Sequence, residues 1–281
     1  NQVNRVILLS DGLANVGPDS PQALADLGSS LRREGISVTT LGLGNGYNED
    51  LMSRLAGTSD GNHAFVESPR DLVRIFDAEF KDAMAIAALD VEISVTCQPG
   101  VKPLRIMNRD GDIRDRVVTV KLTQVLSSQE KYILVELELP AGTSGQTLPV
   151  ATTRVSFRNQ QTKAQEKLDS AVSASFTADV ALAEKSVQKD VKKDVVLQLA
   201  TEANERAVQL RDEGKVKEAK QALQDNAAML KGAASALSAP ALEQYAQQNE
   251  AAAGAVDSEQ WADKRKEMRE EQYQNKTQQT Y

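Results

Sequence analysis

The 281-residue sequence has one cysteine, one histidine and no long apolar run. Cys97 therefore has no partner for an intrachain disulfide, and the alternating apolar residues around it predict a buried structural thiol rather than a nucleophile. Because His63 is the one histidine, a metal site built from several histidines is excluded. No apolar segment has the length needed to cross a bilayer, so we expect no membrane span in this chain.

Positive charge is also in short supply. The chain has 33 Lys and Arg against 40 Asp and Glu, a formal net charge of −7, whereas nucleic-acid binding needs clustered cations. We therefore expect no nucleic-acid partner. The length and the 41% hydrophobic content allow two or three domains with real cores. The sequence begins with Asn1 in the approach to a strand, so we expect a fragment or a processed product.

Residues 4–12 combine an unbroken apolar run with a polar end. The four residues 6–9 do not alternate with polar ones, which is typical of a central parallel strand buried on both faces. Ligands of open α/β sheets bind beyond the carboxyl ends of the strands, where Ser10 and Asp11 would emerge. Asp11 is therefore the first candidate site residue. An acid before glycine is also a common turn residue, and Ser-Asp-Gly by itself favours neither interpretation.

Two more predicted strands, residues 37–43 and 64–66, alternate with helices. Ser20 followed by Pro21 predicts one helix start, and Asn48 predicts the start of a short helix that Gly57 would end. Consecutive strand–helix units build a parallel sheet by right-handed crossovers. Such sheets usually have more than three strands, so we expect further strands before the first residue.

These segments resemble a known family. Residues 3–17 (Val-Asn-Arg-Val-Ile-Leu-Leu-Ser-Asp-Gly-Leu-Ala-Asn-Val-Gly), the strand at 35–44 and the helix at 48–56 occur in the order seen in the second half of a von Willebrand factor A (VWA) domain, most closely its bacterial versions. The resemblance covers about residues 3–86. It implies an α/β, Rossmann-like parallel sheet that is often followed by further β and helical regions.

The resemblance also implies a cation site. In that family a divalent cation is held by an Asp-x-Ser-x-Ser loop, a distant Thr and a late Asp, and Asp11 matches the late Asp. The Asp-x-Ser-x-Ser motif is absent here, since Asp169-Ser170-Ala171 places Ala where Ser is needed. Mg²⁺ or another divalent cation is therefore expected only if the missing N-terminal motif is supplied. The family site leaves a coordination position for an acidic group of a protein partner.

After residue 86 the pattern changes twice. Strict alternation in residues 91–97, 118–122, 133–139 and 155–157 predicts an antiparallel, sandwich-like β domain over residues 87–160. Residues 161–281 carry no strand pattern and predict a helical region. Helical stripes on both sides of Gly214 predict a hairpin near residues 194–232 that resembles one tetratricopeptide-type repeat.

The last helix is predicted from mixed charges. The run Lys264-Arg-Lys-Glu-Met-Arg-Glu-Glu is typical of a solvated helix face, and Gln272 onward is expected to fray. Trp261 is expected to anchor this helix by packing. An isolated helix pair cannot bury a continuous core, so these helices should pack on the rest of the chain or on a second protein partner.

The sequence leaves three classes of function to consider. The resemblance favours a metal-ion-dependent protein-binding or adhesion module. The alternative is a scaffold without a working metal site, in which Asp11 is a turn acid and the helical tail recruits partners. An enzyme has little support because no Ser/His/Asp or Cys/His arrangement is evident. His63, at the entry to a strand, is expected to make a structural hydrogen bond.

Overall fold

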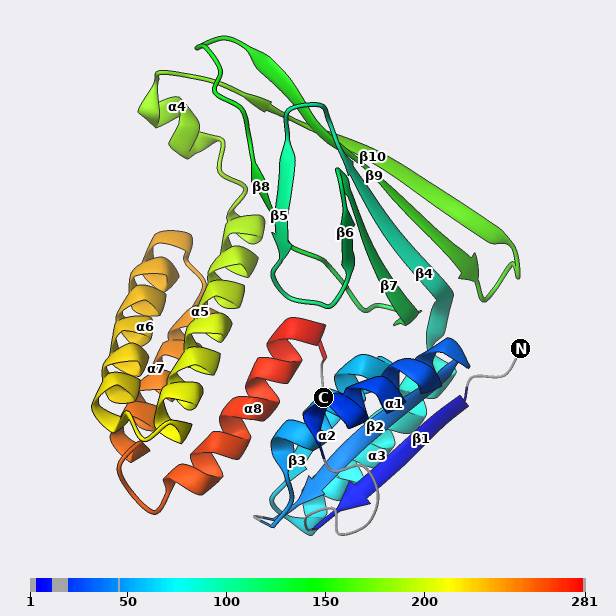
Figure 1. Cartoon of the computed structure of the whole chain (residues 1–281), viewed down its shortest axis with the longest axis vertical. Helices are drawn as coiled ribbons and strands as arrows, with labels where there is room; N and C mark the ends of the chain where they lie inside the picture. Colours follow the sequence, from blue (N-terminus) through cyan, green and yellow to red (C-terminus); the bar gives the residue numbers. More distant parts are fainter. Residues whose placement is uncertain (1–3, 12–19, 45, 280–281) are drawn as a thin grey trace. The chain divides into compact units, whose positions relative to one another are not determined.

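The structure, a computed structural model, describes residues 4–11, 20–44 and 46–279 (Figure 1). The chain forms two compact units, one made of residues up to Ile75 together with residues from Gln188 onward, and one made of Phe76–Val187. The first unit contains β1 (Asn4–Ser10), α1 (Pro21–Arg33), β2 (Ile36–Leu43), α2 (Glu49–Ser59), β3 (His63–Val66), α5 (Lys189–Asp212), α6 (Val216–Leu237), α7 (Pro240–Ala255) and α8 (Trp261–Thr277). The second contains β4 (Ile86–Cys97), β5 (Lys102–Ile106), β6 (Asp112–Arg114), β7 (Val117–Leu126), β8 (Val135–Glu138), β9 (Thr147–Asn159), β10 (Gln165–Ser175) and α4 (Val180–Lys185). Helix α3 (Pro69–Met84) begins in the first unit and ends in the second.

The first unit is built on a parallel sheet in the order β1-β2-β3, as the strand–helix alternation predicts. Ser20 caps α1 by accepting a hydrogen bond from the Ala23 N–H at 3.2 Å. Asn48 caps α2 in the same way through Leu51 N–H at 3.1 Å. The prediction that Gly57 ends α2 was wrong. The helix continues to Ser59, because Asp60 adopts the left-handed conformation that closes it.

The prediction that residues 6–9 are buried on both faces was also wrong. Val6 is 48% exposed and Leu8 38%, because β1 is an edge strand of the described sheet and pairs with β2 alone among the described residues. Strand β2 is instead buried on both faces, although it is rich in Ser and Thr. The hydroxyl of Thr40 donates to the Met52 carbonyl at 3.0 Å, so a polar side chain is satisfied inside the core.

Helices α5 to α8 complete the first unit. Apolar side chains of α5, α6 and α7 form two buried clusters, one of which also includes Trp261 and Met268 of α8. Figure 1 shows α8 running between α5 on one side and α2 with β3 on the other, and α8 contacts all three elements. The expected packing role of Trp261 is confirmed, since the residue is 7% exposed and lies in a buried apolar cluster.

The second unit is antiparallel. A five-stranded sheet has the order β10-β9-β4-β7-β6, and β5 pairs with β8 in a separate two-stranded sheet. Ile106 of β5 and Leu137 of β8 pack against the buried apolar clusters of the larger sheet. Cys97 is fully buried in one of these clusters, as expected, and burial raises the pKa of its thiol.

A strand also occurs where helices were expected. Residues 165–175 form β10, so the prediction of a helical region from residue 161 onward was wrong for this segment. Its eleven residues include two large apolar side chains, Leu168 and Val172. Pairing with β9, and not the local composition, therefore determines that this segment is a strand. Among the described residues, no helix has both the length and the hydropathy required to cross a membrane.

Candidate functional site

Asp11 directly follows β1, at the edge of the sheet where parallel strands end, and its side chain is exposed. Glu67 follows β3 at the same edge. Over the described residues, however, no group of three or more His, Cys, Asp or Glu side chains is arranged so that it could hold a metal ion. These residues therefore do not complete a site for Mg²⁺, and the assignment of Asp11 stays a prediction. The neighbouring loop, residues 12–19, lies outside the described residues.

The polypeptide after β2 is shaped by a glycine and a tyrosine. A Cβ atom at Gly42 would lie 2.1 Å from Cζ of Tyr47, so the ring can cover the strand only because residue 42 has no side chain. Tyr47 is 2% exposed, and its ring centroid lies 6.0 Å from that of Phe65. Burial, together with the nearby Glu49, raises the pKa of the Tyr47 hydroxyl, which keeps it neutral.

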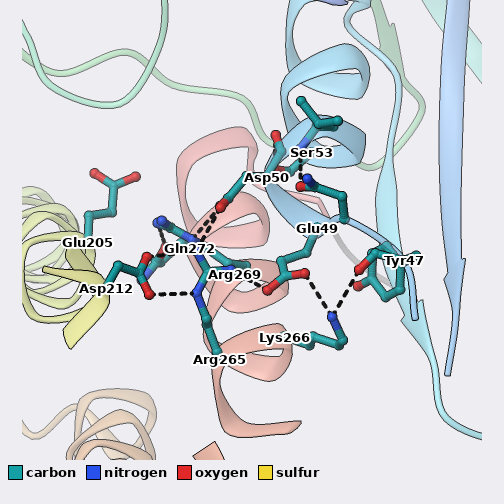
Figure 2. A network of polar contacts seen from close by, with 12 residues as sticks. Tyr47, Glu49, Asp50, Ser53, Glu205, Asp212, Arg265, Lys266, Arg269 and Gln272 are labelled. Carbon is teal, nitrogen blue, oxygen red and sulfur yellow. Dashed lines mark hydrogen bonds and ion pairs between the residues drawn. The ribbon is translucent and has the colours of Figure 1, made fainter. Parts of the chain in front are cut away.

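The first turn of α2 carries Glu49 and Asp50, acids that a helix N-terminus favours. Facing them, α8 presents three cations, Arg265, Lys266 and Arg269. Together with Asp212 at the end of α5, these side chains form what we call the α8 ion cluster (Glu49, Asp50, Asp212, Arg265, Lys266 and Arg269), shown in Figure 2. Three cations face three carboxylates, so the cluster balances its own charge.

Lys266 is the most deeply buried cation of the α8 ion cluster. Its ammonium donates to Glu49 Oε2 at 2.8 Å and to the Tyr47 carbonyl at 3.1 Å. It also lies 4.5 Å from the centroid of the Tyr47 ring, within cation–π range. Its side chain is 6% exposed and that of Glu49 8%, so this is a buried pair with its hydrogen bonds supplied.

Arg265 joins three helices. Its guanidinium donates to Asp50 Oδ2 at 2.7 Å and to Asp212 Oδ2 at 2.8 Å, and it also pairs with Glu49. Figure 2 shows it reaching acids of α2 on one side and of α5 on the other. Arg269 adds an ion pair with Asp50 at 2.9 Å. A single arginine therefore connects the last helix to both the α/β part and the helical part of the first unit.

The pKa values of the acids reflect this balance. Burial works to raise the pKa of Glu49, but the hydrogen bond from Lys266 and the charge of Arg265 outweigh it, so the pKa lies below its usual range. Burial also works to raise the pKa of Asp50, but the charges and hydrogen bonds of Arg269 and Arg265 outweigh it, so this pKa is lowered too. Two acids further along α8 behave differently. Burial raises the pKa of Glu270 to about 7 and that of Glu271 to about 8.

The end of the described chain binds the edge of β3. The side-chain amide of Gln279 accepts from the His63 N–H at 2.9 Å and donates to the His63 carbonyl at 3.0 Å. The Tyr273 hydroxyl donates to the Gly61 carbonyl at 2.6 Å. The prediction that residues from Gln272 onward fray was therefore wrong for residues 272–279, and its last two residues, Thr280 and Tyr281, lie outside the described residues. Gln272 and Tyr273 are buried in α8, which continues to Thr277, and Gln279 is 6% exposed.

His63 makes the structural hydrogen bond expected of it. Its Nδ1 lies 2.9 Å from the Thr40 hydroxyl, and its ring is fully buried. Burial lowers the pKa of His63 to about 4, so the ring is neutral near pH 7. Together with the pairing of Gln279, this makes His63 a point where β2, β3 and the end of α8 meet.

No protein-family model matches the sequence. Two curated proteins do, over parts of the chain. YfbK of Escherichia coli (strain K12), an uncharacterised protein, is 30% identical over 98 residues, which is 34% of this chain and 17% of YfbK. The uncharacterised protein sll0103 of Synechocystis sp. is 24% identical over 156 residues, 52% of this chain and 37% of that protein. The matched regions thus span well under half of either relative.

Solved structures match much more of the chain. A von Willebrand factor type A protein from Catenulispora acidiphila aligns with a TM-score of 0.71 and 14% identity, over 89% of this chain and 58% of that one. The ArnB paralog VWA2 from Sulfolobus acidocaldarius aligns with a TM-score of 0.60 and 16% identity, over 98% of this chain and 63% of that one. The chain has a von Willebrand factor A-like fold. The human COPII-coat protein Sec24c also aligns, with a TM-score of 0.58 and 11% identity, over 96% of this chain and 40% of that one.

Reasoning from the sequence missed the α8 ion cluster of this VWA-like unit. The mixed charges of residues 264–271 predict a solvated face, whereas Lys266 is buried and Arg265 is largely so. One signal was present: cations at positions 265, 266 and 269 fall on one side of a helix, and α2 opens with two adjacent acids. Neither local pattern predicts that the cations of α8 contact the acids of α2.

Proposed function

We propose that this chain is a protein-binding module in which helices α5 to α8 form the recruiting surface and the VWA-like part holds them in place. The observation that carries this proposal is the α8 ion cluster, because it fixes the last helix to both α2 and α5. A buried pair such as Lys266 with Glu49 favours one arrangement of the helices over others. Helices held in this way can present a preformed surface to a partner.

Candidate anchors are the large apolar side chains that α5 and α6 leave exposed. Leu199 is 42% exposed and Met229 39%, and Met is enriched at protein interfaces. The fold comparison supports the same class of function, since Sec24c is a coat protein and its alignment covers nearly the whole of this chain. We propose that the chain works by binding and not by bond-making, and no catalytic residue is assigned.

The second candidate function is metal-ion-dependent binding at Asp11. It is favoured by the exposed position of Asp11 at the carboxyl end of β1, where this carboxylate could meet a cation and an acidic group of a partner protein. The described residues do not complete such a site, so Mg²⁺ would need ligands from elsewhere. Calorimetric titration of the chain with MgCl₂, compared with Asp11→Ala, tests this candidate directly. Equal heats for both proteins would exclude it.

One capture experiment separates the two candidates. The purified chain is immobilised, proteins of its natural source are passed over it with or without chelator, and bound proteins are identified. For recruitment by the helices, we expect capture to be lost with Leu199→Asp and Met229→Asp but kept with Asp11→Ala and with chelator. The reverse pattern would establish the Asp11 site. Capture that no variant and no chelator changes would refute both.

For the second unit, we propose that the two antiparallel sheets form a small β-sandwich. The packing of Ile106 and Leu137 against the five-stranded sheet supports two layers. Replacement of Leu137 by Ala should then loosen the buried cluster around Cys97, and faster reaction of this thiol with a water-soluble disulfide reagent would report it. A reaction rate equal to that of the unchanged protein would refute the layered packing.

A further inference from the structure

Strand β10 forms one edge of the five-stranded sheet, and the described part of the chain offers it no second neighbour. It is eleven residues long, and every residue from 167 to 173 is exposed. An edge strand of this length presents unpaired backbone N–H and C=O groups to any strand that can align with it. Proline, the residue that most firmly blocks such pairing, does not occur in β10.

The side chains of β10 extend the apolar rows of the sheet. Leu168 lies opposite Val155, which lies opposite Ile93, so these three belong to one row on one face. Val172 similarly continues a row through Ala151 and Cys97. The inner members of both rows belong to the buried clusters or pack against them, whereas Leu168 is 62% exposed and Val172 56%. Each row therefore ends in an apolar side chain of β10 that no described residue of the chain shields from solvent.

The order of residues in β10 makes this edge complementary to itself. Leu168 and Val172 lie two residues before and two residues after Ser170, on the same face. If two β10 strands pair antiparallel with Ser170 opposite Ser170, Leu168 of each copy faces Val172 of the other. Each apolar row then continues across the pair, from Val155 and Leu168 to Val172 and Ala151 of the second copy.

Charges are compatible with this register. Asp169 would lie opposite Ala171, and Lys167 opposite Ser173, so no like charges face each other directly. Arg154 of β9 already pairs with Asp169 at 2.7 Å, which compensates the acid nearest to the centre. Moving the register so that Asp169 faces Asp169 would oppose two acids and would break the pairing of Leu168 with Val172.

We propose that two copies of this chain associate through β10, antiparallel and centred on Ser170, to form one continuous sheet. This proposal stands apart from recruitment by the helices, because it concerns the second unit alone. A strand edge and four apolar side chains make a small interface, so the dimer should dissociate on dilution. Sedimentation equilibrium of the whole chain should give a mass that rises with concentration from that of one chain toward that of two.

Charge substitutions test the register. Leu168→Glu and Val172→Lys should each raise the dissociation constant by about tenfold or more, since each places two charges opposite apolar side chains. The double variant carrying both changes should recover the dimer, because each new Glu then faces a new Lys. Both positions are exposed, so folding should be retained, and circular dichroism checks this. Leu104→Glu, at a 49% exposed site in β5, is the matched control and should leave the dissociation constant unchanged.

A cross-link gives an independent measurement. Residues directly opposite in an antiparallel pair have Cα atoms about 4.5–5.5 Å apart, which a disulfide can span. Cys97 is buried, so a thiol introduced by Ser170→Cys would be the reactive one. We expect it to form a disulfide-linked dimer under mild oxidation, and Ser173→Cys in the same strand not to do so. A chain that sediments as a monomer throughout, a double variant that stays dissociated, or cross-linking through Ser173→Cys alone would overturn the proposal.

Discussion

Arg265→Met provides the sharpest test of the α8 ion cluster. The side chain of Arg265 is 17% exposed, and Glu49, one of its partners, is 8% exposed. Removing one partner of a buried ion pair typically costs about 3–5 kcal/mol, because the remaining charge is left uncompensated. Here Glu49 keeps Lys266, and Asp50 and Asp212 can reach solvent at 41% and 42% exposure. We therefore expect the lower end of that range, about 3 kcal/mol.

The single tryptophan, Trp261, allows the loss of unfolding free energy to be measured in the first unit, where the α8 ion cluster lies. Trp261 is buried in α8 among side chains of α5 to α7, with the guanidinium of Arg211 5.9 Å from the ring centroid, so its fluorescence reports the first unit. With urea m-values of about 1–3 kcal/mol per molar, a loss of about 3 kcal/mol lowers the unfolding midpoint by roughly 1–3 M. Circular dichroism would report unfolding of the whole chain for comparison.

A matched control removes a cation from an exposed pair. Lys231 pairs with Glu250 across α6 and α7 at 2.7 Å, and both side chains are about half exposed. Exposed pairs contribute little, so Lys231→Met should leave the midpoint unchanged within error. If Arg265→Met lowers the Trp261 midpoint no more than Lys231→Met does, the α8 ion cluster does not hold the first unit together, and the proposed recruiting surface loses its support.

Three further predictions follow from the same unit. In the folded chain Glu270 keeps its proton up to about pH 7 and Glu271 up to about pH 8, whereas the unfolded chain has already lost both protons at these pH values. The folded state therefore binds more protons, and the free energy of unfolding should fall as pH rises from about 5 to about 8. Urea midpoints across that range should show this fall, and the double change of both residues to Gln should flatten it. Gly61→Ala should cost on the order of 1–3 kcal/mol, because its Cβ would lie 2.1 Å from the Val38 carbonyl oxygen, and a thermal midpoint equal to the unchanged protein's would contradict this. Gly232→Ala lies in the interior of α6, and apart from the neighbouring residues and backbone of that helix nothing lies within 4 Å of the new Cβ. It should instead stabilise by about 0.5–1 kcal/mol, and a lowered thermal midpoint would count against that reasoning.

The sequence predicts the elements of the α/β part because their signals are local. Ser20 and Asn48 occupy the N-cap positions expected of them, and the parallel sheet follows from the alternation of strands and helices. Burial within that sheet could not be predicted from apolarity. Within the part of the chain that the structure describes, the apolar strand β1 pairs on one side only, whereas β2 is buried between two strands, and its Thr40 hydroxyl is satisfied internally.

Strand β10 shows a second limit. Its Ser, Ala and charged residues have modest strand propensity, and the pairing with β9 that forms it depends on tertiary structure. The alternation of Leu168 and Val172 with polar neighbours was the one local sign. Because the strand lies at an edge, its apolar side chains are exposed, and the pattern lacks the apolar density by which the buried strands β4 and β7 are recognised.

The candidate site was missed for a related reason. Asp11 is recognisable because an acid at the end of an apolar strand is a local pattern. The contact of Arg265 with Glu49 joins residues 216 positions apart, and so does that of Gln279 with His63. A helix of mixed charge looks the same in the sequence whether its cations meet water or buried acids, so only the fold decides between these alternatives.

The helical region is therefore part of the first unit and not an appended tail. Acids at the start of α2 would be only partly compensated by the helix N-terminus, and the edge of β3 would be open, if α8 were elsewhere. The cations of α8 compensate the acids of α2, and the side-chain amide of Gln279 pairs with the backbone N–H and C=O of His63 at the edge of β3. Helix α8 and the residues after it thus contact both the acidic start of α2 and His63 of β3. The recruiting surface proposed for α5 to α8 is accordingly fixed to α2 and β3, so a partner that bound there would bind a surface held by the whole unit.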